Sequence, residues 1–185
     1  MKFPLFRRSA RPDTISALYG MIVAQARLSC FYRDYTVADT VSGRFDLIVL
    51  HLALVLDRLA QDPALRTLGQ GVFDRFCQDM DHNLREMGVG DLTVPKERMG
   101  EAFYGRQMAY LAALALPDDG RALVETVGRN IYGGSASAQA AAARLAAYIR
   151  LTVHDLKGQD PASLAAGELR LPDPAAILAT TGLRS

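Results

Sequence analysis

Apolar residues recur at helical spacing along most of the chain, beginning close to its amino terminus. Asp13 can cap a helix over residues 13–28, and one apolar face of that helix would comprise Ile15, Leu18, Ile22 and Ala26. The next segment, residues 29–43, is irregular and rich in aromatic residues. Its β-branched and aromatic content would also allow one short strand.

The most apolar helix is predicted from residue 42 or 43 to about residue 60. One stripe of this helix comprises Phe45, Ile48, Leu52, Leu56 and Leu59, and a second face holds Leu47, Leu50 and Leu54. A helix that is apolar nearly all round belongs at the centre of a bundle. We therefore expect this helix to lie in the core.

Four more helices follow, each bounded by start or stop signals. The third is expected over residues 71–87, after an Asp62-Pro63 start signal, and Gly88 closes it. The remaining helices are predicted over residues 95–116, from after Asp118-Asp119 to about residue 132, and from residue 135 to about 157, with Ser135 as the cap of the last. Short terminal pieces begin at Asp160-Pro161 and Asp173-Pro174.

These elements predict an all-α, single-domain bundle of about six helices with short terminal pieces. Residues 1–12 would form a flexible basic tail, residues 13–170 the helical domain and residues 171–185 a flexible carboxy-terminal tail. The first tail alternates basic and apolar residues, namely Lys2, Phe3, Leu5, Phe6, Arg7, Arg8 and Arg11. Such a stretch can lie on an anionic membrane surface or touch RNA phosphates, or it is a disordered solubilising tail.

Composition narrows the class of protein. Half of the 185 residues are hydrophobic and 22% are charged, which supports one sizeable core and excludes a disordered chain. The formal net charge of +1 does not favour DNA or another polyanion as partner, and two cysteines are too few for a disulfide scaffold. The most apolar run, Leu47–Leu56, is about half of the roughly 20 residues that a spanning helix needs. We expect a cytoplasmic protein, with peripheral contact at the inner face of the membrane as its closest approach to lipid.

Patterns that carry catalysis or bind metals are sparse. The sequence has no glycine-rich phosphate loop, no G-x-S-x-G elbow and no C-x-x-C pair, so we expect no nucleotide-binding fingerprint, no structural zinc site and no cofactor. His51 lies on the most apolar helix, where a hydrogen-bonded core histidine is expected. Asp79 and His82 are three residues apart on one helix and could share a metal ion. The alternative is ion pairing along a solvated helix face, of Arg75 with Asp79, Asp81 with Arg85 and His82 with Glu86.

Polar residues concentrate between residues 74 and 106, in a segment that contains DMDHNLREMGVGDLTVPK. With this segment the chain resembles the ubiquinol–cytochrome c chaperone family, whose members assist assembly of respiratory complex III. The matching pieces are LYGMIVAQAR, VSGRFDLIVLHLALVLDRL, FDRFCQDMDHNLREMGVGDLTVPKERMGEAFYGRQMAY and RNIYG, which together span residues 18–133. The pattern DMDxxLRExGVGDxxVPK is the most specific of them.

The resemblance implies a chaperone that binds newly made cytochrome b, or an early assembly intermediate, and catalyses no reaction. It also implies a contact with the ribosome near the exit tunnel and a small companion protein. The sequence carries no long organelle-targeting presequence, which fits a bacterial member of the family.

A client-binding surface would need apolar and aromatic contact area inside a polar rim. On the fourth helix, Tyr104, Arg106 and Tyr110 could supply the contact area, since Tyr and Arg are common at binding hot spots. The charged rim would comprise Asp79, Asp81, Arg85, Glu86, Asp91 and Lys96. Core packing is the alternative for Tyr104 and Tyr110. Two other functions stay open from the residues alone: a metal- or haem-handling helical protein with Asp79 and His82 as ligands, and a general helical interaction module.

Overall fold

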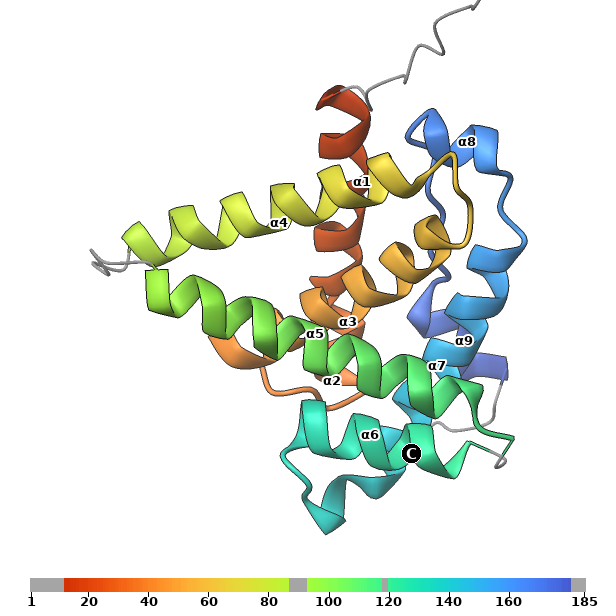
Figure 1. Cartoon of the computed structure of the whole chain (residues 1–185). Helices are drawn as coiled ribbons and strands as arrows, with labels where there is room; N and C mark the ends of the chain where they lie inside the picture. Colours follow the sequence, from red (N-terminus) through yellow and green to blue (C-terminus); the bar gives the residue numbers. More distant parts are fainter. Residues whose placement is uncertain (1–11, 87–92, 118–119, 181–185) are drawn as a thin grey trace, which may run out of the picture.

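The computed structural model describes residues 12–86, 93–117 and 120–180, and the side chains of all but residues 84–86, 93–99 and 178–180 of these. Every regular element in these ranges is a helix, which confirms the all-α prediction. The elements are α1 (Pro12–Ala26), α2 (Ser29–Arg33), α3 (Val41–Ala60), α4 (Arg66–Glu86), α5 (Thr93–Ala115), α6 (Arg121–Tyr132), the 3₁₀ turn η1 (Ala136–Ala138), α7 (Gln139–Lys157), α8 (Pro161–Ala165) and α9 (Pro174–Thr180) (Figure 1).

Six of these helices have twelve or more residues, and they correspond to the six that the sequence predicts. Three details of the prediction were wrong. The aromatic segment after α1 contains the short helix α2 rather than a strand. Asp62-Pro63 begins a turn rather than the helix: the Asp62 carboxylate accepts the backbone N–H of Ala64. Helix α4 itself begins at Arg66. The Ser135 side chain bonds to the Ser137 hydroxyl and does not cap α7, which begins after η1.

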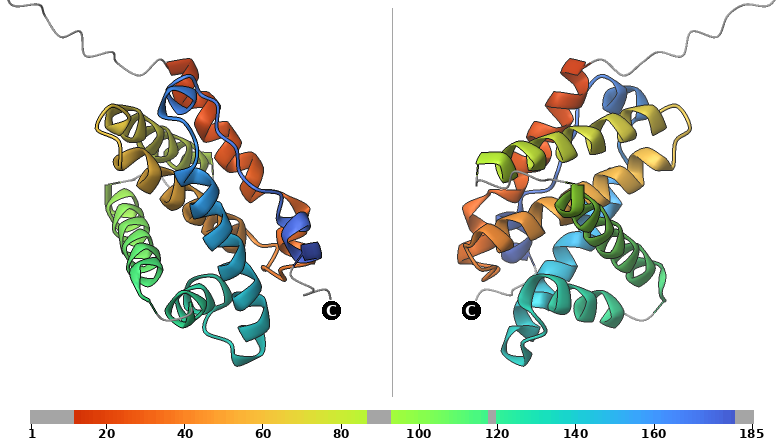
Figure 2. Two further views of the ribbon diagram at one scale, coloured as in Figure 1. Left: turned by 90° about the vertical axis from the view of Figure 1, so that its right-hand side faces the viewer. Right: turned by 60° about the vertical axis from the view of Figure 1, so that its left-hand side comes forward.

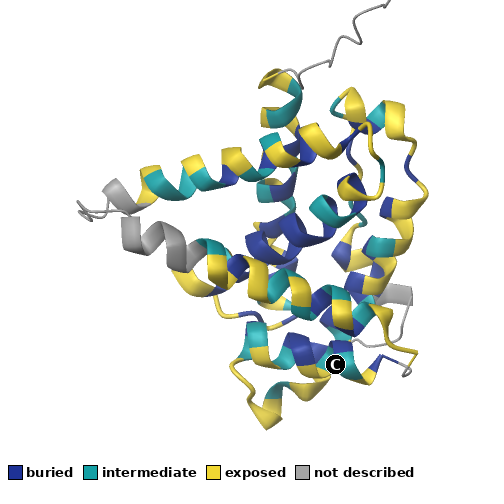
Figure 3. Ribbon diagram, viewed as in Figure 1, coloured by how far each residue is buried: buried dark blue, intermediate teal, exposed yellow. Residues whose placement is uncertain are grey.

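Helix α3 lies at the centre of the bundle, as its all-round apolar pattern predicts. It packs against α1, α4, α5, α6 and α7, and it is the most continuously buried helix in Figure 3. The Thr40 hydroxyl caps its amino terminus by accepting the backbone N–H of Gly43 at 3.1 Å. A Cβ at Gly43 would collide with the carbonyl oxygen of Ala38, so this tight entry into the helix requires glycine.

The carboxy-terminal segment runs back along the bundle to the first helix (Figure 2). The Gln25 side chain donates to the carbonyl of Pro172 at 2.7 Å, and the Tyr35 hydroxyl donates to the carbonyl of Pro174 at 2.9 Å. Helix α9 packs on α2 and α7 and buries Ile177. Residues 171–180 of the predicted carboxy-terminal tail are therefore packed on the bundle here, while the predicted division into tails and domain stays a prediction.

Helices α4 and α5 cover a different side of α3 from α7. Helix α4 packs on α1 and α3, whereas α5 packs on α3 and α6. Within the described residues, no helix is both long enough and apolar enough to cross a bilayer. The predicted basic tail, residues 1–12, lies outside the described residues except for Pro12.

Candidate functional site

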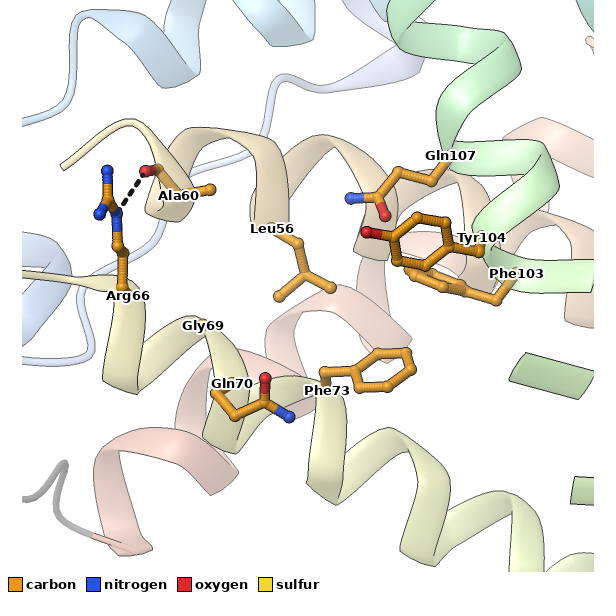
Figure 4. A pocket seen from close by; sticks show the side chains of 9 residues that line it. All are labelled: Leu56, Ala60, Arg66, Gly69, Gln70, Phe73, Phe103, Tyr104 and Gln107. Carbon is orange, nitrogen blue, oxygen red and sulfur yellow. Dashed lines mark hydrogen bonds between the residues drawn. The ribbon is translucent and has the colours of Figure 1, made fainter. Parts of the chain in front are cut away.

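A cleft of about 350 Å³ opens between the carboxyl-terminal half of α3, the first turns of α4 and the middle of α5 (Figure 4). Its apolar wall is formed by Leu56 from α3, Phe73 from α4 and Phe103 from α5. Gly69 brings α4 close to α3, because a Cβ there would lie 3.3 Å from the Cβ of Leu59. The cleft is thus made where three helices meet and α4 is held tightly against the core.

Phenylalanine rings form a continuous layer beneath the cleft. The ring centroids of Phe73 and Phe103 are 5.1 Å apart, and those of Phe76 and Phe103 are 5.8 Å apart. Phe45 extends the layer into α3, with its centroid 6.3 Å from that of Phe76. Tilted aromatic pairs at these distances pack favourably and hold a rigid surface. The base of the cleft is therefore aromatic, apolar and preformed.

The edge of the cleft is polar but carries little charge. Gln70 and Gln107 contribute amides, Tyr104 contributes a hydroxyl and Arg66 contributes a cation (Figure 4). The Arg66 side chain donates to the carbonyl of Ala60 at 3.3 Å at the carboxyl end of α3. Among the described residues that line the cleft there is no carboxylate, histidine or cysteine. This set of side chains favours binding over acid–base or metal chemistry.

The two tyrosines predicted to share a binding patch lie in different environments. Tyr104 is 64% exposed and lines the cleft, whereas Tyr110 is fully buried in the core. Burial raises the pKa of Tyr110 far above its usual range. Tyr110 therefore drops out of the candidate surface, and Tyr104 stays in it.

Arg106 connects α5 to the core helix. Its guanidinium lies 2.9 Å from a carboxylate oxygen of Asp46 and 5.8 Å from the ring centroid of Phe45. Burial raises the pKa of Asp46, and the positive charge of Arg106 partly opposes that rise. Because the pair is largely removed from water, it fixes α5 over α3 beside the aromatic layer. Arg106 thus positions the cleft rather than lining it.

The acidic residues predicted as a rim are divided between the described and undescribed parts of the chain. Asp79 faces α1, where it accepts a hydrogen bond of 2.9 Å from the Tyr19 hydroxyl. Burial and this bond raise the pKa of Tyr19, and the Arg75 guanidinium lies 6.0 Å from the Tyr19 ring centroid. Asp81 is half-buried on the same helix. The predicted contact residues Arg85, Glu86, Asp91 and Lys96 have side chains outside the described residues.

His82 is exposed on α4, three residues after Asp79. In the described part of the chain, no group of three or more His, Cys, Asp or Glu side chains could hold a metal ion. The hydrogen bond from Tyr19 gives Asp79 a partner across the α1–α4 interface. Asp79 and His82 thus have no third ligand in the described residues with which to build a site.

Sequence reasoning missed most of the cleft. Leu56 was recognised only as a core residue, and the rim residues Arg66, Gln70 and Gln107 were not singled out. One signal was present: α5 carries apolar residues on more than one face, and because it packs mainly on α3 and α6, part of this apolar surface stays uncovered.

Comparisons with known proteins agree on one relationship. The family model described as ubiquinol-cytochrome C chaperone matches residues 33–171. The crystal structure of the Cbp3 homolog from Brucella abortus superposes on the chain with a TM-score of 0.82 at 38% sequence identity. That match covers 92% of this chain and 96% of the other. No curated protein matches the chain significantly.

Proposed function

Because the chain belongs to the ubiquinol–cytochrome c chaperone family, we propose that it binds newly made cytochrome b, or an early assembly intermediate, in the cleft between α3, α4 and α5. Membership supports a role in assembly of respiratory complex III. To this role the proposal adds two points, the identity of the client and the place on the chain where the client binds.

The observation that carries the proposal is an aromatic cleft with an open, polar edge on which Arg66 is the one charged lining residue among those described. An unfinished membrane subunit exposes apolar side chains that would otherwise aggregate, and a chaperone shields them by offering apolar contact area inside a polar border. Leu56, Phe73 and Phe103 offer that area, while Gln70 and Gln107 can pair with backbone groups that the client has not yet satisfied. Binding of this kind is reversible and involves no covalent step.

Other partners stay predictions from the family resemblance. These are a ribosome contact near the exit tunnel, a small companion protein and a peripheral contact with the membrane. Nothing in the cleft depends on them, so the client can be tested separately.

The test is complementation of a strain that lacks the gene. Loss of the gene should lower cytochrome b and ubiquinol–cytochrome c reductase activity selectively, and the wild-type chain should restore both. Tyr104→Glu places a charge at the edge of the cleft on an exposed side chain and should restore neither. Leu151→Glu is the matched control, because Leu151 is an exposed apolar residue on α7, away from the cleft.

Two results would overturn the proposal. A normal amount of cytochrome b in the deletion strain would contradict the proposed role in assembly. Full complementation by a stably expressed Tyr104→Glu chain, together with normal recovery of cytochrome b on that chain in mild detergent, would remove the cleft as the client site.

A further inference from the structure

Helix α5 has a second apolar face that the bundle leaves uncovered. Tyr104, Met108 and Ala112 follow one another at intervals of four residues on one side of α5, and Leu116 continues this spacing one residue beyond the end of the helix at Ala115. All four are exposed, and the three large side chains are exposed by 64%, 54% and 53%. We call this set the α5 stripe. Its first residue lines the cleft, so stripe and cleft form one surface.

The stripe differs from the other exposed apolar residues in the described part of the chain. Val41 and Leu151 are exposed singly, and Leu28 lines a smaller pocket of about 230 Å³ with Met21 and Leu171. Isolated exposed apolar residues are normal on protein surfaces, whereas a contiguous set marks an interaction site. The α5 stripe is such a set.

The surroundings of the stripe indicate the chemistry of its partner. Residues 107–117, QMAYLAALALP, contain no Asp, Glu, Lys or Arg. The nearest preceding charge on the helix, Arg106, is turned toward Asp46. Helices that pair in water usually place charged residues beside the apolar seam, where they select the partner and its orientation. A seam without such charges complements a partner that is also uncharged along its length.

The length of the stripe limits the partner further. Twelve residues separate Tyr104 from Leu116, which corresponds to about 18 Å along a helix. A helix that spans a bilayer needs roughly 20 apolar residues, or about 30 Å. The stripe would therefore cover somewhat more than half of such a helix. The small side chain of Ala112 in its middle permits close approach of another backbone.

We propose that the α5 stripe docks one uncharged, apolar client helix along about three turns, with one end of that helix seated in the cleft. This inference rests on the proposed function, and it specifies that the client segment is a membrane-type segment bound as a helix rather than as an extended chain. The order of events follows: the client forms its helix before or during binding, and the chaperone covers one side of it.

The chain contains no tryptophan, which provides a direct experiment. Met108→Trp places a single indole in the stripe, and Leu151→Trp places one on α7 as the control. The probe is a synthetic helix of about twelve leucine and alanine residues with two lysines at each end. A second probe has the same length and flanks but a proline in the middle, which breaks the helix. Binding of the helical probe should shift the emission of the Met108→Trp chain to the blue and leave that of Leu151→Trp unchanged.

A charge in the stripe tests the surface independently. Ala112→Glu introduces a carboxylate at an exposed position in the last turn of α5, where the cost to a helix of this length is small, so the fold should be retained by circular dichroism. Placed in the chain that carries Met108→Trp, this change should weaken the helical probe about tenfold or more, whereas adding Leu151→Glu should not. The proline probe should bind about tenfold more weakly than the helical one.

The inference is overturned by equal affinity for the two probes, by an Ala112→Glu chain that binds as tightly as the unmodified one, or by a dimer that Ala112→Glu dissociates in sedimentation. The last result would mean that a second copy covers the stripe. These failures differ from failure of the proposed function: deletion of the gene could still lower complex III while the stripe binds nothing. Conversely, probe binding with normal complex III after deletion would retain the stripe and remove the role in assembly.

Discussion

The two sides of the central helix α3 are packed differently: one is closed by buried side chains, and the other borders an open cleft. Toward α7, every ring in a buried cluster meets another: the centroid of Phe31 lies 5.3 Å from that of His51 and 5.0 Å from that of Tyr148. His51 lies 2.7 Å from the carbonyl of Leu47 through Nδ1 and 2.8 Å from the Tyr148 hydroxyl through Nε2. Toward α4 and α5, the rings of Phe73 and Phe103 instead line an open cleft.

The hydrogen bonds on the closed side determine the state of the histidine. A carbonyl can only accept, so Nδ1 of His51 carries the proton and Nε2 accepts from the hydroxyl of Tyr148. Gln25 in turn donates to the Tyr148 oxygen at 3.0 Å. The closed side therefore gives its buried polar groups specific partners, whereas the open side has unshielded apolar surface. This contrast fits a stabilising role for the first side and the client binding that we propose for the second.

The largest expected effect comes from a pair of tyrosines, one on each side. Tyr148→Ala should lower the free energy of unfolding by about 3–5 kcal/mol, because it opens a cavity and leaves His51 and Gln25 without the hydroxyl. Tyr104→Ala should change it by less than about 0.5 kcal/mol, since that side chain is mostly in water. Urea denaturation followed by circular dichroism measures both. Equal destabilisation by the two changes would remove the contrast.

The second-largest effect should come from acid, which should lower the free energy of unfolding through His51 on the closed side. Burial lowers the pKa of His51 to about 4, from an ordinary value of 6.5. Between these two values the unfolded chain binds a proton that the folded chain does not, so stability falls as the pH is lowered through this window. The loss from this residue should be about 3 kcal/mol, and stability should not depend on it above pH 6.5. Urea titrations at pH 6.5 and 4.5 measure the free energy of unfolding, which should fall less between these two pH values in a His51→Gln chain than in the original chain. An equal fall in both chains would contradict the assignment.

The smallest effects on stability are expected at Tyr104, where two substitutions should differ clearly in their effect on binding. Tyr104→Phe removes only the exposed hydroxyl and should leave the midpoint of thermal unfolding within about 2 °C of the original. It should also bind the apolar helical probe with unchanged affinity, because the ring supplies the contact area, whereas Tyr104→Ala should bind it more weakly. Titration by calorimetry separates the two variants. Equal affinity of Tyr104→Phe and Tyr104→Ala would show that the ring contributes nothing.

The order of the helices could be predicted from the sequence because local periodicity and capping residues determine it. Helix α3 was identified as the core helix for the same reason: apolar residues occur on all of its faces. The short helix α2 was not predicted, since its five residues, SCFYR, have no capping side chain and gain their stability from burial of Cys30 and Phe31. Tertiary packing decided that element.

The site could be predicted only in part, because its geometry depends on residues far apart in the chain. Tyr104 and Tyr110 lie six residues apart on a helix with apolar residues on several faces, so periodicity could not say which would be buried. The Tyr19–Asp79 and Asp46–Arg106 pairs each join positions sixty residues apart, and no local pattern reports them. The family resemblance indicated the function, but the specific motif that carries it extends through residues 87–92, outside the described residues.

The carboxy-terminal segment has a consequence for the timing of folding. The partners that Gln25 and Tyr35 hold, the carbonyls of Pro172 and Pro174, are 147 and 139 residues further along the chain. A ribosome makes these acceptors long after the donors, so Gln25 and Tyr35 can form these hydrogen bonds only once more than a hundred further residues have been made. Because the acceptors are backbone carbonyls, any residue with the right backbone path can complete the closure, whereas Gln25 and Tyr35 must keep their donors. Removal of residues 172–174 would consequently leave Gln25 and Tyr35 without these acceptors, so its effect would reach the part of the molecule that is made first.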